Sequence, residues 1–459
     1  MHTGSRGLTR QRTTVSTVLG LLLVAVAVTP AHADSVRSKQ WHLDAMKAEE
    51  MWETSTGDGV TVAVIDSGVD ETNPDLAGQV LKGLNLEHNV SGDEFKDYNG
   101  HGTGMAGIIA GTGKSRGGDG AFGLAPGAKI LPIRIFDSTK TANQASADRQ
   151  FNREAPAAIR YAVDHGAKIV NISLGHETGS QQLTSAVKYA LEKGSLIFAA
   201  VGNSGDKANM VEYPAGTPGV VGVGAIGEDL RKTDESQYGG QVDLSAPGED
   251  VVYACAGETG VCRGHGTSDA TAIASASAAL IWSKHRDWTN NQVLRVMLNT
   301  AGGPTSGAER TDYIGYGIVR PRIALKTPGD PGPADEYPLP DLAAAESAQP
   351  SAKPSKATGS SESDDTPATA APASDTDSNI GLWIGLGIGV AALIGAAVTA
   401  LAIRSRRRKA TVATAPPAYP HPYQQFPSQP TQPAYGSPPS APPGSNSPRG
   451  GPPTQGPYA

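Results

Sequence analysis

The sequence predicts an α/β fold in which a mostly parallel sheet is covered by helices on both faces. From about Gln40 to Leu325, short runs of β-branched and other apolar residues alternate with amphipathic or small-residue stretches. Strands that are buried on both faces give continuous apolar runs, and helices connect the strands of a parallel sheet. The stretch has the size of one ordinary enzyme domain, which we place at 34–326.

Five strands are predicted from runs dominated by Val, Ile, Leu and Ala. Runs of this length that stay apolar throughout are typical of strands in the interior of a parallel sheet. The predicted strands cover 60–65, 130–136, 168–173, 196–201 and 220–225.

Five helices are predicted from the stretches between and after these runs. The helix that begins at His101 contains Gly102, Gly104 and Gly107, although glycine lowers helix propensity. This composition indicates that the helix packs tightly against a neighbouring backbone. The predicted helices cover 101–111, 155–165, 180–193, 268–285 and 290–300.

Residues 1–33 have the layout of a secretory signal peptide. Three arginines precede an apolar run from Val18 to Val28, and the small-residue triplet Ala31-His32-Ala33 follows this run. We therefore expect the mature chain to begin at Asp34 and to be exported.

A second apolar run, at 380–403, contains 24 residues and no charge. This length can span a hydrocarbon core about 30 Å thick. A buried core helix is the alternative, but the flanking sequence offers nothing for such a helix to pack on. Four arginines and a lysine lie within 404–409, and the positive-inside rule therefore places the C-terminus in the cytoplasm. We expect a single-pass protein of the cell membrane whose folded domain, 34–326, lies outside the cytoplasm.

The segments on either side of this predicted membrane span lack the composition of a folded domain. Residues 327–379 are rich in Pro, Ala, Ser and acids, and we expect a disordered linker about 40 Å from end to end. Residues 404–459 form a basic cluster and a Pro-rich tail, which is either a docking segment for Pro-recognising modules or simply solvated.

The net charge of −7 reflects the linker. Its ten carboxylates and two lysines give −8, so the rest of the chain is close to neutral. A domain that is close to neutral has no positive electrostatic potential that would attract nucleic acid. We therefore expect no nucleic-acid partner.

Cys255 and Cys262 are the two cysteines of the chain. Both lie on the exported side, where an oxidising compartment favours a disulfide, and two free thiols are the alternative. A disulfide would close a short loop and stiffen the segment that leads to Ser268.

Three segments carry the residue types of a nucleophilic hydrolase. Asp66 ends a buried strand, at the edge of the sheet where open α/β folds place their active sites. His101 opens the glycine-rich helix, and Ser268 begins a helix whose free backbone N–H groups suit an oxyanion. Taken alone, each residue has a simpler explanation as a turn or cap residue. Together they supply an orienting acid, a general base and a nucleophile.

Two further residues bear on this site. Asn203 follows the apolar strand at 196–201, and its side-chain amide can donate to an oxyanion, although a turn asparagine is the simpler alternative. His265 repeats the His-Gly-Thr triplet close to Ser268, but the Gly-x-Ala-Gly pattern that follows His101 is missing there. We interpret His265 as a loop residue.

These motifs resemble those of the subtilases, the subtilisin-like serine peptidases, over roughly 40–325. The order Asp, His, Ser is the subtilisin order. The resemblance implies a subtilisin-like fold in which Asp66 orients His101, His101 is the base and then the acid, and Ser268 attacks. It also implies that the Asn203 side chain and the Ser268 N–H form the oxyanion hole. The segment that would bind substrate as an added strand is Ser173-Leu174-Gly175.

The layout of the whole chain is similar to that of the mycosins, membrane-anchored subtilases associated with type VII secretion systems. This resemblance implies protein substrates and membrane components of the secretion system as partners. The alternative function is a structural subunit that stabilises a secretion complex, with proteolysis secondary. We expect no cofactor and no metal, because no recognisable calcium loop is present and Asp93, Glu94 and Asp97 are too loosely spaced to be claimed as ligands.

Two departures from the usual subtilase pattern lead to further expectations. The 32 residues at 34–65 are too few for a folded inhibitory propeptide, so we expect activity without removal of one. Asp269 stands beside the nucleophile, where many subtilases have Met. We hypothesise that Asp269 narrows substrate choice or damps general proteolysis.

Overall fold

The computed structural model describes residues 35–136, 140–257 and 259–348. Within these residues, no helix is long and apolar enough to cross a membrane. The predicted signal peptide, membrane span, basic cluster and Pro-rich tail lie outside the described residues, as does most of the predicted linker.

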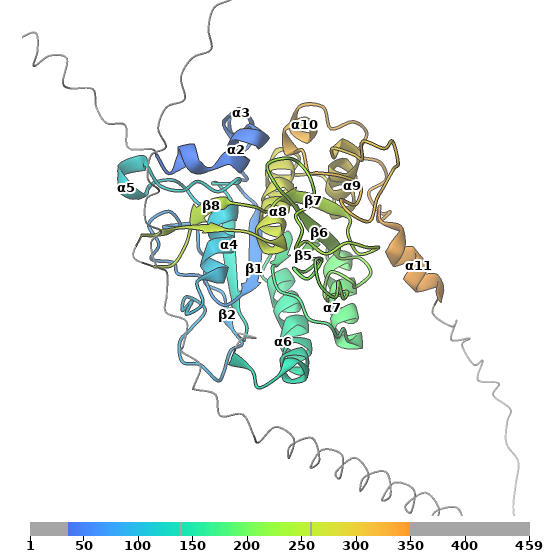
Figure 1. Cartoon of the computed structure of the whole chain (residues 1–459), viewed down its shortest axis with the longest axis horizontal. Helices are drawn as coiled ribbons and strands as arrows, with labels where there is room; N and C mark the ends of the chain where they lie inside the picture. Colours follow the sequence, from blue (N-terminus) through green and yellow to red (C-terminus); the bar gives the residue numbers. More distant parts are fainter. Residues whose placement is uncertain (1–34, 137–139, 258, 349–459) are drawn as a thin grey trace, which may run out of the picture. The chain divides into compact units, whose positions relative to one another are not determined.

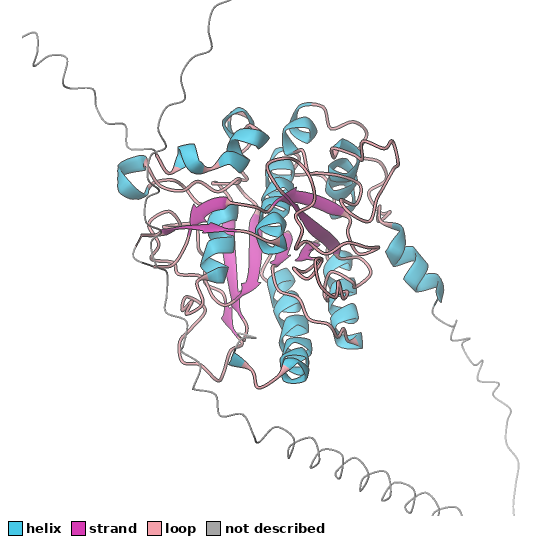
Figure 2. Cartoon of the chain, in the orientation of Figure 1, coloured by secondary structure: helices cyan, strands magenta, loops and turns pink. Residues whose placement is uncertain are grey.

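A seven-stranded parallel sheet forms the centre of the described domain (Figures 1 and 2). Its order is β2-β3-β1-β4-β5-β6-β7, so the first long strand, β1, lies inside the sheet between β3 and β4. The bounds are β1 Thr61–Asp66, β2 Leu84–Asn85, β3 Lys129–Arg134, β4 Ile169–Ile172, β5 Leu196–Ala200, β6 Val221–Ile226 and β7 Leu244–Pro247.

Helices cover both faces of the sheet. Successive residues of a strand point to opposite faces, and Val62 and Val64 of β1 accordingly pack in one core cluster while Ala63 and Ile65 pack in the other. The first cluster includes residues of α4 (His101–Ala110), α8 (Thr267–Lys284), α9 (Asn290–Thr300) and α10 (Pro321–Lys326). The second includes residues of α6 (Gln144–Asp164) and α7 (Gln181–Glu192). The predicted α/β class with a mostly parallel sheet is therefore confirmed.

Helix α8 is largely buried. Fifteen of its residues are buried, and most of them are Ala, Ser or Thr, which allow the helix to lie close to the sheet. A hydrogen bond from Ser275 Oγ to Asn171 Oδ1 of β4, at 3.0 Å, joins the helix to the sheet. Small side chains therefore bring the N-terminus of α8 close to the carboxyl ends of the strands.

The five predicted strands correspond to β1, β3, β4, β5 and β6, with ends that agree within two residues. Four of the five predicted helices agree equally well. The start of α6 was predicted wrongly, eleven residues too late. In the structure the helix continues through Pro156, and the side chain of Asn143 caps its true N-terminus by accepting from Ser146 N.

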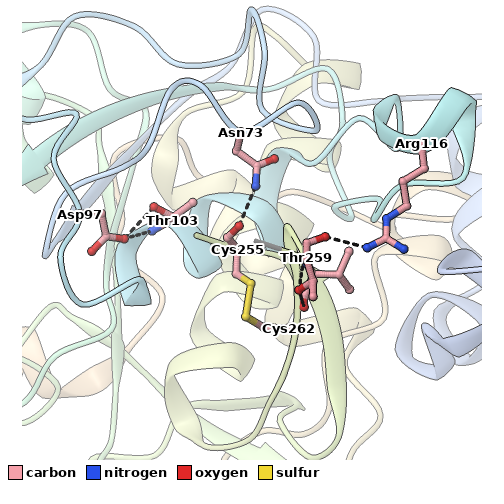
Figure 3. Close-up of a disulfide and its surroundings, with 8 residues drawn as sticks. Asn73, Asp97, Thr103, Arg116, Cys255, Thr259 and Cys262 are labelled. Carbon is pink, nitrogen blue, oxygen red and sulfur yellow. Dashed lines mark hydrogen bonds between the residues drawn. A yellow bond between two sulfur atoms is a disulfide. The ribbon is translucent and has the colours of Figure 1, made fainter. Parts of the chain in front are cut away.

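An antiparallel hairpin, which the sequence analysis did not predict, precedes α8. It consists of β8 (Val251–Ala254) and β9 (Val261–Gly264). A disulfide between Cys255 and Cys262 joins the two strands near the turn, with Cα atoms 5.8 Å apart (Figure 3). Asn73 Nδ2 donates to Cys255 O at 2.8 Å and thereby ties the hairpin to the loop that follows β1. The predicted disulfide is confirmed, and it restrains the chain shortly before Ser268.

The N-terminal segment of the described chain also packs on the domain. It forms η1 (Arg37–Lys39), α2 (Trp41–Met46) and α3 (Ala48–Trp52). Gln40 is fully buried, and its side-chain amide donates to Phe122 O at 2.7 Å and to Val252 O at 2.9 Å. These bonds hold the segment against both the hairpin and the loop after α5 (Ser115–Gly118).

The packed part of the chain extends beyond residue 326, so the predicted start of the disordered linker at 327 is too early. Arg295 donates to the backbone carbonyls of Pro331, Pro333 and Glu336. Farther along, Tyr337 Oη donates to Gly219 O at 2.8 Å, and Asp341, in α11 (Pro340–Ala348), accepts from Gly219 N at 2.9 Å. Composition misled the prediction because this segment is held largely through its backbone carbonyls, which accept hydrogen bonds from Arg295 and from the side chains of Thr289, Asn291 and Gln292.

Replacing Arg295 with Ala should loosen residues 327–340. The variant loses three charge-assisted hydrogen bonds, and we expect about 1–2 kcal/mol less stability in urea unfolding and faster proteolytic cleavage between Thr327 and Pro340. The matched control is Arg322→Ala, which removes a half-exposed arginine whose ion pair with Glu50 is long, at 3.9 Å. Equal cleavage in Arg295→Ala and wild type would contradict the expectation.

Candidate active site

Asp66 and His101 form a close pair at the carboxyl end of the sheet. Asp66 is the last residue of β1 and is 1% exposed, whereas His101 is the first residue of α4. His101 Nδ1 lies 2.8 Å from Asp66 Oδ1 and 2.9 Å from Asp66 Oδ2. Burial lowers the pKa of His101, but the charge and hydrogen bond of Asp66 and the charges of Asp269 and Asp97 outweigh it and raise this pKa to about 9.

The close approach of α4 to β1 explains the glycines at the start of this helix. A Cβ on Gly102 would lie 2.2 Å from Gly68 O, and a Cβ on Gly107 would lie 2.2 Å from Ala254 O. Any side chain at these positions would push α4 away from the strand and from the hairpin. The predicted packing of this helix against neighbouring backbone is therefore confirmed.

Asp97 supports this pair, and the sequence analysis considered it only as an unconvincing metal ligand. Its carboxylate accepts hydrogen bonds from the N–H groups of Gly100 and Thr103 at the N-terminus of α4 and from the Thr103 hydroxyl. It also accepts from the Ser67 hydroxyl at 2.9 Å. A carboxylate is favoured at this end of the helix dipole, so Asp97 fixes the start of α4 and with it the position of His101. The signal in the sequence that could have identified Asp97 is an acidic residue shortly before a glycine and a helix start.

Ser268 lies in the first turn of α8, where backbone N–H groups have no partner within the helix. Its hydroxyl donates to Ser173 O at 3.0 Å, and the Ser173 hydroxyl donates to Ser268 O at 3.0 Å. In the part of the chain that the structure describes, no hydrogen bond joins Ser268 to His101. Helices α4 and α8 pack against each other on the same face of the sheet (Figure 1).

The side-chain amide of Asn203 is oriented by Thr267, the neighbour of Ser268. Asn203 Oδ1 accepts from Thr267 N at 2.9 Å and from Thr267 Oγ1 at 3.0 Å. A backbone N–H can only donate, so the oxygen of the amide must face Thr267. The Nδ2 group then points elsewhere, and it donates no hydrogen bond to the described residues. It is an available donor next to the start of α8.

The segment Ser173-Leu174-Gly175 follows β4 directly. Apart from Ser173 O, its carbonyls and N–H groups form no backbone hydrogen bonds with the described residues. Just beyond it, His176 and Tyr213 form an isolated antiparallel bridge, with hydrogen bonds of 3.0 and 2.7 Å in the two directions. The segment therefore has unpaired backbone groups next to Ser268, which an extended peptide could use.

Two further titratable residues flank Ser268. Asp269 is 2% exposed, and its Oδ2 has no hydrogen-bond partner among the described residues. Burial, opposed by the charges of His101 and His265, raises the pKa of Asp269 to about 7. His265 is exposed, and its Nδ1 lies 2.7 Å from Glu235 Oε1. The interpretation of His265 as a loop residue is confirmed, because it lies between the end of β9 and the start of α8. Across the described ranges, no group of three or more His, Cys, Asp or Glu side chains could hold a metal ion.

Comparison with known proteins places this arrangement in a family. The model of the subtilase family matches residues 57–324. Thermitase from Thermoactinomyces vulgaris is 33% identical over 270 residues, which cover 59% of this chain and 90% of thermitase. Subtilisin E from Bacillus subtilis (strain 168) is 33% identical over 273 residues, which cover 59% of this chain and 67% of its own length.

Two of the similar solved structures are those of MycP1 and MycP3. MycP1 from Mycobacterium smegmatis matches with a TM-score of 0.56 and 27% identity, over 65% of this chain and 87% of that chain. MycP3, described as a protease from the type VII (ESX-3) secretion system, matches with a TM-score of 0.55 and 31% identity, over 62% of this chain and 88% of that chain. The family match, the named proteinases and these structures agree: the chain belongs to the subtilase family and is a subtilisin-like serine peptidase.

Proposed function

We propose that this peptidase cleaves proteins through a triad of Ser268, His101 and Asp66. The observation that carries the proposal is the pairing of His101 Nδ1 with the buried carboxylate of Asp66 at the carboxyl end of β1. This bond fixes the ring so that Nε2 is the nitrogen left to accept a proton. The neighbouring helix supplies Ser268 as the nucleophile.

Substrate binding can release the nucleophile for attack. The Ser268 hydroxyl donates to Ser173 O, a carbonyl that an extended substrate would use for one of its own N–H groups. Once a substrate N–H donates its hydrogen bond to Ser173 O, the Ser268 hydroxyl is free to turn towards His101. Segment 173–175 thus acts as the substrate-binding strand, and substrate binding to it allows the Ser268 hydroxyl to turn towards His101.

The chemical steps then follow from the geometry. His101 takes the proton of Ser268 as its Oγ attacks the scissile carbonyl, and the oxyanion accepts hydrogen bonds from Asn203 Nδ2 and Ser268 N. The tetrahedral intermediate collapses as His101 gives its proton to the leaving amine, which leaves an acyl-enzyme. Water repeats the sequence and regenerates Ser268.

The cellular setting is part of the same proposal. The signal-peptide layout of 1–33 and the apolar run at 380–403 support an exported catalytic domain that is held at the cell membrane by one helix, with a cytoplasmic C-terminus. The likeness to MycP1 and MycP3 supports a link to a type VII secretion system. The substrates would be exported proteins or components of that system.

Replacing Ser268 with Ala should abolish both labelling by a fluorophosphonate probe and hydrolysis of peptide substrates. Loss of the nucleophile in a triad of this kind costs about 10⁶-fold in turnover. The matched control is Ser283→Ala, which removes a hydroxyl from the other end of α8 and should leave both activities intact. Labelling of the Ser268→Ala protein at wild-type rate would refute the proposed nucleophile.

The same variant separates proteolysis from a structural role in cells. A Ser268→Ala strain that loses a processed form of an exported protein but keeps its secretion complex supports the peptidase function. The structural alternative is supported if the Ser268→Ala strain loses no processed protein and still assembles the complex. Deletion of 34–326 should then prevent assembly.

The proposed anchor predicts a membrane-bound protein. Wild type should stay with the membrane fraction after alkaline carbonate extraction, because a helix inserted in the bilayer is held far more firmly than a peripheral domain. Deletion of 380–403 should release the protein, whereas deletion of 410–459 should not. Carbonate-soluble wild type would contradict the single-pass arrangement.

The charges around His101 predict an alkaline activity profile. Only neutral His101 can act as the base, so kcat/KM should rise with pH towards about 9, the pKa given above. Asp269 is ionised over most of this range and stabilises the imidazolium, so Asp269→Asn should lower the pKa of His101. We expect the rising limb to move to lower pH by roughly half a pH unit, with higher activity near pH 7.

The matched control for this measurement is Asp250→Asn, which removes an exposed carboxylate paired with Arg263. Its pH profile should coincide with that of wild type. A profile for Asp269→Asn that stays in place or moves to higher pH would show that Asp269 does not damp the activity at neutral pH.

A further inference from the structure

We infer that Glu212 makes this peptidase prefer a lysine or arginine immediately before the scissile bond. The inference deepens the proposed function and rests on it, because it assumes that Ser268 attacks a peptide lying along segment 173–175. It names the substrate class of that site, which the sequence analysis left open.

The first step is to locate the side chain that precedes the scissile bond. The attacked carbonyl carbon must lie beside Ser268 Oγ, with its oxygen towards Asn203 Nδ2, and the chain before it must run along segment 173–175. The side chain of this residue therefore enters the space between segment 173–175 and the end of the segment that leads to Asn203. Each of these segments carries a glycine there, Gly175 and Gly202.

The carboxylate of Glu212 occupies the space between these two glycines. A Cβ on Gly175 would lie 2.0 Å from Glu212 Oε2, and a Cβ on Gly202 would lie 2.6 Å from Glu212 Oε1. The bridge between His176 and Tyr213 holds the backbone next to Glu212 against the segment that carries Gly175. The glutamate therefore lies where a substrate side chain would end.

This carboxylate is held in place but has no cation partner in the described part of the chain. Gln237 Nε2 donates to Glu212 Oε1 at 2.8 Å and to Ser204 Oγ at 2.9 Å, which fixes the side chain. Glu212 Oε2 accepts no hydrogen bond from the described residues, and no ion pair reaches the group there. The neighbouring charge is a second carboxylate, that of Glu177.

The environment of Glu212 favours a substrate that brings a positive charge. Burial raises the pKa of this carboxyl to about 7, against the hydrogen bond from Gln237, and the charge of Glu177 raises it further. An ammonium or guanidinium group beside Oε2 would compensate the carboxylate and restore its ionisation. Lysine and arginine carry this charge at the end of a long apolar stem, which can reach from the substrate backbone to the carboxylate between the two glycines. A substrate carboxylate at this position would face two like charges.

The test compares two peptidyl phosphonates that differ only in the residue that enters this site. One carries lysine and the other norleucine, which has the same stem without the charge. The full-length protein is incubated with each, and the rate of modification of Ser268 is measured by mass spectrometry. We expect wild type to react at least tenfold faster with the lysine compound, Glu212→Gln to lose this preference, and both to react equally with the norleucine compound.

Two more variants make the result specific. Glu177→Gln removes the exposed neighbouring carboxylate and should keep most of the preference for lysine. Glu212→Lys should reverse the preference towards a glutamate phosphonate, an outcome that a purely structural role for the hydrogen bond with Gln237 would not produce. Equal reaction of wild type with lysine and norleucine, or a preference that survives in Glu212→Gln, would overturn the inference and leave the proposed triad intact. Failure of all phosphonates and of a simple fluorophosphonate to modify Ser268 in wild type would overturn the proposed function, and this inference with it.

Discussion

The hydrogen bond between His101 and the buried carboxylate of Asp66 is the contact on which the rest of the site depends. It joins the end of β1 to the start of α4, two elements separated by 35 residues of chain. It forms only because Gly102 lets the helix approach the strand and because Asp97 holds the first turn. The imidazole is therefore fixed by packing and by backbone hydrogen bonds, which leaves little to be ordered when substrate arrives.

The other half of the site is built by the same means from the other end of the chain. The N-terminus of α8 is held from both sides, since Asn203 accepts from Thr267 and Ser173 exchanges hydrogen bonds with Ser268. The disulfide between Cys255 and Cys262 restrains the hairpin that leads into this helix. Small buried side chains then let α8 lie close to the sheet. Four separate strand ends or helix starts thus supply Asp66, His101, Asn203 and Ser268, and the parallel sheet brings them to one edge.

The sequence predicted the interior strands and the motif residues because both have local signals. Apolar runs mark β1, β4 and β5, and the motifs around Asp66, His101 and Ser268 each stand at the end of such an element. Parts held by distant backbone contacts were not predictable in this way. Residues 327–340 look like a disordered linker, yet Arg295 binds their carbonyls. Glu212 carries no motif, and its importance appears only when the fold brings Gly175 and Gly202 around it.

The carboxyl groups of Asp269, which is buried, and of Glu212, which is partly buried, share one physical property. Burial raises the pKa of each to about 7, so each is costly to ionise and each gains most from a nearby positive charge. For Asp269 that charge is protonated His101, and the interaction keeps His101 protonated near neutral pH. For Glu212 it would be the side chain of the substrate itself. If both proposals hold, the two carboxyl groups lower general activity at neutral pH and raise selectivity for substrates that carry a positive charge.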